Sequence, residues 1–271
     1  MQKITDNVFV ETRFVCNTGL VVTKQGVVAI DTPMNPADAV KWRAEIAKHG
    51  SLCYLINTEP HQDHITGNYF YDVPIVAHVG TRKVILANSA EQYKEQMSKT
   101  NPESMPLLKG FWYRLPTITF TDQLTLHVGD HTFELVHLPG HTASNLAVYV
   151  PEEKVVFTSD NLTVGVQAWM HDALPFDWLQ SLDRISQLDA DVLVPGHGDV
   201  TTKAILPEMK ALVETWIDSV SAAKKKGMSL EQATATIGLP MMDKRPVPPG
   251  AEQAMEQMRK WNIARLYSVM N

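Results

Sequence analysis

Four potential metal ligands lie close together in one short polar segment of the chain. They are Glu59, His61, Asp63 and His64. Because alternate side chains of an extended loop point the same way, Glu59 and His61 can share one ion, while Asp63 and His64 turn toward a second. Two imidazoles with carboxylates suit borderline ions such as zinc, iron or manganese. Taken alone, the segment favours metal binding, with an ordinary polar turn that has a capping aspartate as the alternative.

Three further potential ligands follow strand-like runs later in the chain. His141 and His197 each lie in a Pro-Gly-His turn, and Asp160 directly follows an apolar, β-branched run. We expect the glycine before each histidine to let the backbone bend sharply, so that the imidazole faces inward. Loops at one edge of a layered α/β sheet converge on one site. The four segments together therefore predict a metal site.

The elements that must position these residues are mainly strands in the first part of the chain. Residues 1–80 are predicted to form strands around one helix, which begins at Asn35-Pro36 and ends near Gly50. Residues 80–98 have a helical pattern, and strands return between 124 and 158. This order predicts an α/β layered domain.

The last third of the chain is predicted to be mostly helical. A buried strand is expected at 192–194, and the strongest helical stripe runs over 201–225. The Pro- and Lys-containing segment 239–250 is expected to connect the last two helices, which gives the layered domain a helical appendage at its C-terminal end.

Composition favours an ordinary globular protein that acts on small molecules. The chain has 271 residues and a net charge of −6, which argues against nucleic-acid binding. No apolar run approaches the ~18 residues of a membrane span, and the N-terminus has no signal-peptide stretch. Cys16 and Cys53 are expected to be free thiols, which fits a cytoplasmic location. Nothing indicates a particular oligomeric state.

The ordered motifs resemble the metallo-β-lactamase-fold hydrolase superfamily. Its signature is His-x-His-x-Asp-His, then a histidine in a Pro-Gly-His-Thr turn, a bridging aspartate and a final Pro-Gly-His. The resemblance extends from the opening strands, including Asp31 at the end of one of them, to His197 and beyond. It implies an αβ/βα four-layer sandwich of two mixed β-sheets with a metal site at one edge. We therefore predict this fold for residues 1–200, with 201–271 as a helical extension packed on the same domain.

The resemblance also implies a role for each motif residue. His61 and His141 would bind the first of two divalent ions, with Glu59 in the place usually held by histidine. Asp63, His64 and His197 would bind the second ion, and Asp160 would bridge both. The implied nucleophile is a metal-bridging hydroxide, and Asp63 would also accept a proton during turnover.

Glu59 is the main departure from the family pattern and leaves three interpretations open. The glutamate substitutes as a ligand, the first site is weakened so that one ion or a different ion binds, or the site is inactive and serves only binding. Zinc is the expected metal, and the oxygen ligand makes manganese or iron an alternative.

One histidine and several aromatic residues are candidates for substrate contact. His171 lies about ten residues after Asp160, in a loop expected to overhang the metals, and is either a substrate contact or an exposed loop residue. The aromatic residues of 111–113, 169–170 and Phe176 are predicted either to line an apolar pocket or to pack a helical lid.

These features favour a metal-dependent hydrolase that cleaves a small organic ester, thioester, lactone or amide. The alternatives are a non-haem iron oxidoreductase on the same fold, a β-lactamase-like amide hydrolase and a non-catalytic binding protein. All seven ligand positions are filled, which disfavours enzymes that use a single iron.

Overall fold

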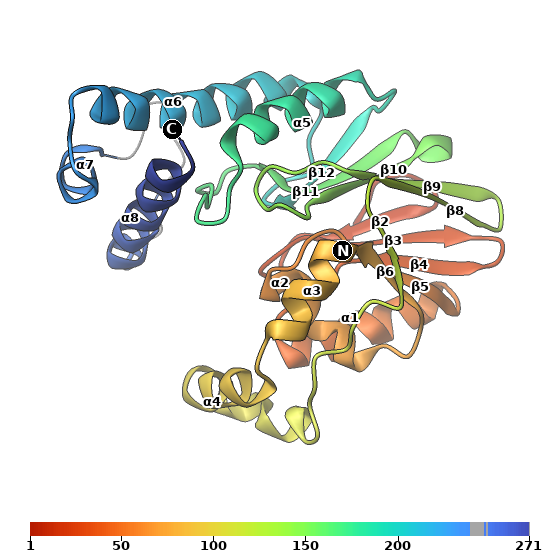
Figure 1. The fold of residues 1–271 in the computed structure, drawn as a ribbon. Coiled ribbons are helices and arrows are strands. Elements are labelled where there is room, and N and C mark those ends of the chain that lie inside the picture. The colour runs from red at the N-terminus through yellow and green to blue at the C-terminus, as the bar shows by residue number, and fades with distance from the viewer. Residues whose placement is uncertain (239–246, 248, 271) are drawn as a thin grey trace.

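The computed structural model describes residues 1–238, 247 and 249–270. Most of the predicted connection 239–250 therefore lies outside the described residues. Two mixed β-sheets face each other, and helices cover the outer face of each (Figure 1). The four layers confirm the predicted αβ/βα sandwich.

The first sheet contains seven strands in sequential order, antiparallel from β1 to β4 and parallel from β4 to β7. Its strands are β1 (Gln2–Lys3), β2 (Val8–Glu11), β3 (Thr18–Thr23), β4 (Gly26–Ile30), β5 (Leu52–Asn57), β6 (Ile75–His78) and β7 (Ile118–Phe120). The second sheet has the order β12-β11-β10-β9-β8, in which only β11 and β12 pair in parallel. Its strands are β8 (Gln123–Val128), β9 (His131–His137), β10 (Leu146–Val150), β11 (Val155–Thr163) and β12 (Val192–His197).

Helices form the two outer layers and the C-terminal part. They are α1 (Pro36–His49), α2 (Gln62–Ile65), α3 (Val79–Ala87), α4 (Ala90–Thr100), α5 (Pro175–Gln187), α6 (Leu206–Lys225), α7 (Leu230–Thr236) and α8 (Glu252–Val269). Short 3-10 helices lie at Thr66–Phe70, Pro102–Leu108, Pro151–Glu153 and Lys203–Ile205. The single helix expected over 80–98 is two helices, because the Ser89 side chain caps a new helix by accepting a hydrogen bond from the Gln92 backbone N–H.

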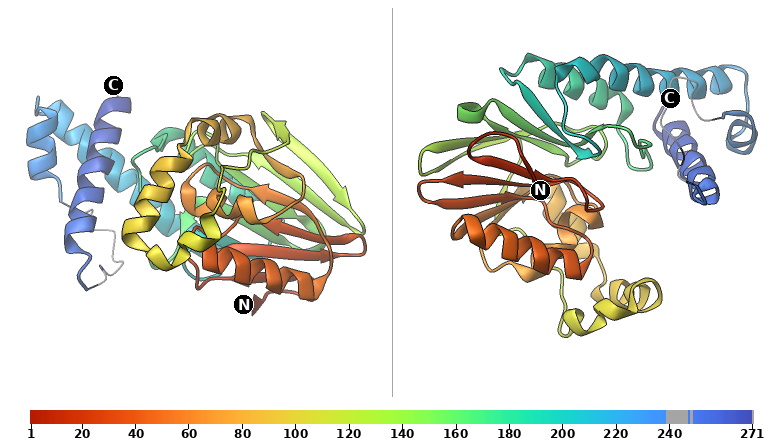
Figure 2. Two further views of the ribbon diagram at one scale, coloured as in Figure 1. Left: turned by 90° about the horizontal axis from the view of Figure 1, so that it is seen from below. Right: turned by 180° about the vertical axis from the view of Figure 1, so that it is seen from behind.

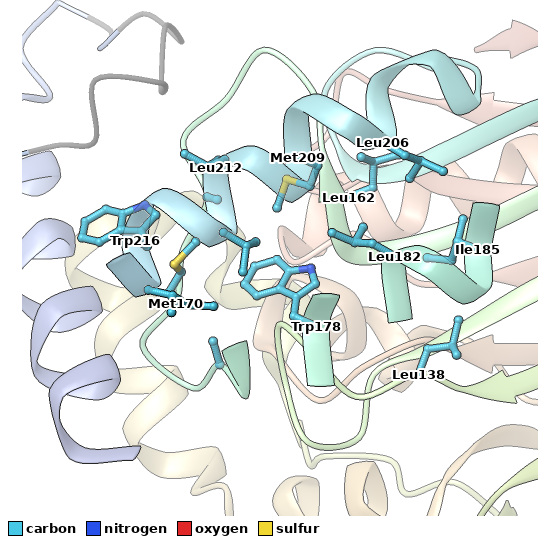
Figure 3. Close-up of a cluster of buried hydrophobic side chains, with 14 of the residues drawn as sticks. Leu138, Leu162, Met170, Trp178, Leu182, Ile185, Leu206, Met209, Leu212 and Trp216 are labelled. Atoms are coloured by element: carbon cyan, nitrogen blue, oxygen red, sulfur yellow. The ribbon is translucent and has the colours of Figure 1, made fainter. Parts of the chain in front are cut away.

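Separate apolar clusters hold the layers together. One lies between the sheets and includes Val28, Phe133 and Phe157. A second packs α1 on the first sheet. A third packs α5 and α6 on the second sheet, with Trp178 and Trp216 fully buried (Figure 3).

The third cluster also contains side chains from beyond residue 200. Ile263 and Leu266 of α8 are buried in it, beside Met170 of the loop that joins β11 to α5. The division into 1–200 and 201–271 stays a prediction. Both cysteines are free, as expected. Among the described residues, no helix combines the length and hydropathy needed to span a bilayer.

Candidate metal centre

The predicted ligands come together at one end of the sandwich, and both sheets contribute. The segment after β5 supplies Glu59 and His61, and the one-turn helix α2 supplies Asp63 and His64. The second sheet supplies His141 in the loop after β9, Asp160 within β11, and His197 as the last residue of β12.

The predicted ligands form two groups of donor atoms within this end, and a third group contains His61, His171 and Asp172. The first contains Glu59, His61, His141 and Asp160, whose donor atoms all lie within 4.8 Å of one another. In it, His61 Nδ1 lies 3.0 Å from Glu59 Oε1 and 3.1 Å from His141 Nε2. The second group contains Asp63, His64 and His197.

Asp160 faces both groups. Its Oδ1 lies 3.1 Å from His64 Nε2, and its Oδ2 lies 3.1 Å from His197 Nε2 and 3.5 Å from His141 Nε2. Glu59 also reaches across, since its Oε1 lies 3.3 Å from His64 Nε2. The geometry therefore allows either carboxylate to contact two ions.

In three histidines, the outer ring nitrogen, which points away from the other donor atoms, faces a hydrogen-bond acceptor. His64 Nδ1 lies 2.9 Å from Asp31 Oδ2, His197 Nδ1 lies 2.7 Å from the Val15 carbonyl oxygen, and His61 Nε2 lies 3.1 Å from Asp172 Oδ2. In a neutral ring the proton then sits on the outer nitrogen, and the inner nitrogen presents a lone pair to the carboxylates.

Converging lone pairs and carboxylates repel unless a cation lies among them. Consistent with such a cation, Glu59 Oε2, His64 Nε2 and Asp160 Oδ1 are buried and have no hydrogen-bond partner among the described residues. Buried polar atoms are otherwise almost always paired. The donor set therefore fits divalent metal ions with nitrogen and oxygen ligands.

The electrostatics of the centre favour cations of any kind. Burial alone would lower the pKa of His197, but Asp160 and Asp63 raise it to about 10. Burial likewise opposes the charged form of His61, and Glu59 and Asp172 raise its pKa to about 11. Protons occupy these rings when metal is absent, so metal binding must release protons and weaken as the pH falls.

Asp31 supports the centre from the first sheet. Its carboxylate accepts hydrogen bonds from the backbone N–H and the hydroxyl of Thr58, at 2.8 and 2.5 Å, as well as facing His64. Thr58 Oγ1 also lies 2.7 Å from Ser159 Oγ, which joins the two sheets. Asp31 and Ser159 have φ angles of 56° and 53°. This left-handed conformation is uncommon for residues other than glycine, and it is found most often at functional sites.

The two glycines before His141 and His197 have a different role from the one predicted. Neither has a positive φ angle. A Cβ at Gly196 would overlap Asp160 Oδ1 and lie 2.8 Å from the Asp160 backbone N. A Cβ at Gly140 would lie 2.9 Å from Trp178 Cγ. Glycine is needed here for close packing, and not for a bend.

A cavity of about 640 Å³ opens over the donor groups. Its apolar wall includes Val15, Val166, Trp169 and Met255, so residues of the C-terminal part contribute to it. Val15 is 60% exposed. The cavity is large enough for a small organic molecule.

Only part of the predicted aromatic wall lines this cavity. Trp169 does, whereas Phe111 and Tyr113 are buried in a cluster with α3 and α4, Met170 is buried in the core, and Phe176 is exposed away from the cavity lining.

His171 lies over the donor groups, as predicted for its loop. Its ring stacks on that of His61, with centroids 5.1 Å apart and planes inclined by 21°, and it lines the cavity. Burial lowers the pKa of His171, with a further contribution from His61. The neighbouring Asp172 was not singled out from the sequence, although its position beside His171 was the available signal.

Comparisons with known proteins agree with the fold and the motifs. Residues 12–197 match the family model described as "Metallo-beta-lactamase superfamily". The chain is 25% identical over 215 residues to a "Metallo-beta-lactamase type 2" of Bacteroides fragilis, covering 76% of this chain and 78% of that protein. It is 25% identical over 243 residues to a "Hydroxyacylglutathione hydrolase" of Brucella anthropi, covering 89% and 80%.

A third relative and a solved structure extend the comparison. The chain is 28% identical over 203 residues to the "2,4-dinitroanisole O-demethylase subunit alpha" of a Nocardioides strain, covering 72% of this chain but only 54% of that protein. The solved "Metallo-beta-lactamase from Pontibacter korlensis" superposes with a TM-score of 0.63 at 23% identity, covering 79% of this chain and 97% of the other. With the matched family model spanning most of its length, the chain belongs to the metallo-beta-lactamase superfamily.

Proposed function

We propose that the protein is a dinuclear metal-dependent hydrolase that cleaves a small organic ester, thioester, lactone or amide. The observation that carries the proposal is the convergence of donor atoms from both sheets beside a cavity. Among the described residues, the buried atoms Glu59 Oε2, His64 Nε2 and Asp160 Oδ1 of this set have no hydrogen-bond partner. The relatives named as a β-lactamase and as a hydroxyacylglutathione hydrolase support hydrolysis of an acyl bond.

The residues divide between two ions in this proposal. Glu59, His61 and His141 would hold the first, Asp63, His64 and His197 the second, and Asp160 would contact both. When bound, such ions lower the pKa of water and polarise the substrate oxygen. Zinc is the proposed metal, and Glu59 keeps manganese and iron as alternatives.

Two side chains at the cavity wall would act on the substrate directly. Asp63 lies 3.2 Å from His197 Nε2 and lines the cavity, where its carboxylate can accept a proton during turnover. His171 presents a ring with a lowered pKa above the centre, so a neutral imidazole would contact the substrate.

The test is metal reconstitution followed by a substrate panel. The apoprotein would be loaded with zinc, manganese or iron, the bound metal counted by elemental analysis, and turnover measured on p-nitrophenyl esters, thioesters, lactones and a cephalosporin. We expect close to two ions per chain and hydrolysis that chelation abolishes. A His141→Ala variant should lose both metal and activity, whereas a control at exposed His127 should keep them.

Several outcomes would change the proposal. A protein that retains no metal after reconstitution would overturn it. One tightly held ion would support the weakened first site. Iron with a visible chromophore and no hydrolysis would favour the oxidoreductase alternative, and cephalosporin as the best substrate would favour a β-lactamase-like amide hydrolase, the activity in the name of the Bacteroides fragilis relative.

A further inference from the structure

The outer nitrogens of His61, His64 and His197 are held by unequal partners. Asp31 and the Val15 carbonyl hold His64 and His197. Asp31 and Val15 lie in segments next to strands of the first sheet. His61 instead faces Asp172, which belongs to the loop between β11 and α5 and is separated from it by 111 positions in the chain.

The loop that carries Asp172 is fastened to the C-terminal helix α8, which lies beside it (Figures 1 and 2). Asn262 is fully buried, its Oδ1 accepts a hydrogen bond from the Met170 backbone N–H at 2.7 Å, and its Nδ2 donates to the Ala168 carbonyl at 3.1 Å. These two bonds fix the loop backbone just before Asp172.

Arg265, one turn further along α8, fixes the other side of the same residue. Its Nε donates to the Ala173 carbonyl at 2.9 Å, and its Nη2 donates to the carbonyl of Asp172 itself at 3.4 Å. Trp261 adds aromatic contacts to Trp169 and His171, with ring centroids 5.9 and 6.4 Å away. The place of Asp172 is therefore determined by α8.

We propose that Asp172 is a positioning residue for His61, and that α8 sets its position through Asn262 and Arg265. By accepting the proton of His61 Nε2, Asp172 leaves Nδ1 as a lone pair directed at Glu59 and His141. Carboxylates that hold the outer nitrogen of a ligating histidine orient the ring and raise its basicity. The inference rests on the proposed metal centre and adds that a helix outside the matched region 12–197 controls one half of it.

The first test is a metal titration of the Asp172→Ala variant against a competing chelator. We expect the affinity of the ion held by His61 to fall roughly 10- to 100-fold, as is usual when such a partner is removed, while the ion held by His64 and His197 keeps its affinity. Asp177→Ala changes an exposed carboxylate on α5 and serves as the matched control. The melting temperature of each metal-free variant checks that the fold is intact.

A spectroscopic measurement separates positioning from a general structural effect. Long-range proton–nitrogen NMR of the histidine rings in the zinc-loaded protein reports which nitrogen carries the proton. We expect the Nε2–H form of His61 in the parent protein, and loss of its hydrogen-bonded proton signal in Asp172→Ala. An Nδ1–H form in the parent would contradict the proposal.

Variants of α8 test the second half of the inference. Asn262→Leu and Arg265→Met should weaken the same metal ion as Asp172→Ala, and combining either with Asp172→Ala should add little. Gln257→Leu, on the exposed side of α8, is the control. If Asn262→Leu does not fold, Arg265→Met alone decides, since it removes only hydrogen bonds to loop carbonyls.

The failures of the two proposals can be told apart. If neither the parent protein nor any of its variants binds metal, the proposed function is wrong. If the parent binds two ions and Asp172→Ala leaves both affinities within about twofold, the positioning role is wrong and the hydrolase proposal stands.

Discussion

Glu59 alters the charge at the centre of the site. With Glu59, Asp63 and Asp160 ionised, the donors bring a charge of −3, whereas a histidine in place of Glu59 would leave −2. A more negative donor set makes the ions weaker Lewis acids and their water less acidic. The glutamate is completely buried, so solvent does not screen this difference.

Replacing this residue by the family's histidine should reverse the effect. We expect Glu59→His to raise zinc affinity relative to manganese and to move the alkaline rise of the pH–rate profile to lower pH. Competitive metal titrations and pH profiles of parent and variant measure both. If neither changes, Glu59 does not contact the ions.

Asp160 is the residue whose loss should damage both halves of the centre. It faces His64, His141 and His197, so Asp160→Ala should weaken both ions, each by more than the roughly 10- to 100-fold cost of losing an outer-shell partner. We expect a larger loss of turnover than for any other ligand variant except His61→Ala and His141→Ala. Near-normal turnover with two ions bound would exclude a bridging role.

At the scale of the elements, the parallel pair β11 and β12 aims two of the donors. The register between these strands shifts on both sides of Ser159, so that His197 pairs with Thr163, while the His197 ring lies 3.1 Å from Asp160 Oδ2. The strand ends at Thr163, beyond the apolar run in the sequence, because residues 158–163, which are polar except for Leu162, are buried. Their burial follows from tertiary contacts and has no local sequence signal.

Gly196, which lies within β12, should be irreplaceable. Gly196→Ala would push against Asp160, and we expect it to cost about 1–3 kcal/mol of folding free energy through overpacking and to weaken metal binding. Gly238, where a Cβ would meet only open space, is the control. Urea unfolding and metal titration measure the two effects. If Gly196→Ala matches the Gly238→Ala control in both, β11 moves enough to accommodate the added Cβ, and the prediction is wrong.

The sequence predicts the site better than its surroundings, for a physical reason. Each of the seven donors lies in a segment that follows an apolar, β-branched run, and such runs are readable from the sequence. Asp172 escaped prediction because its position depends on Arg265, 93 positions away, and such contacts leave no local pattern. The same holds for Val15, whose role as a cavity wall and as the partner of His197 depends on how the two sheets pack.

For the whole molecule, an ion pair outside the set of metal donors should contribute to the dependence of stability on pH. The side chain of Glu11 is 6% exposed, and Arg13 Nε donates to its Oε1 at 2.8 Å. The hydrogen bond from Arg13 lowers the pKa of Glu11 from 4.5 to about 2. Because the pKa is lower in the folded state, this stabilisation is present above pH 4.5 and is lost as the pH falls toward 2.

The variant Glu11→Gln should remove this pH dependence. We expect it to be less stable at pH 7 by about 1 kcal/mol, since Arg13 is exposed and solvent screens the pair, and equal to the parent protein near pH 2. Urea unfolding across this range measures the difference. A constant difference at all pH values would mean that the Glu11 charge does not matter.

The metal donors belong to both sheets, so ions bound there would fasten the two halves of the sandwich to each other. An unfolded chain cannot gather these side chains, so bound metal stabilises only the folded state, by about 2.7 kcal/mol when the free ion is at 100 times its dissociation constant. A chelator should therefore lower the melting temperature of the parent protein and leave that of Asp160→Ala nearly unchanged; equal shifts would contradict this coupling. In a cell with little available metal, the protein would be degraded faster as well as being inactive, because proteases cleave the unfolded form.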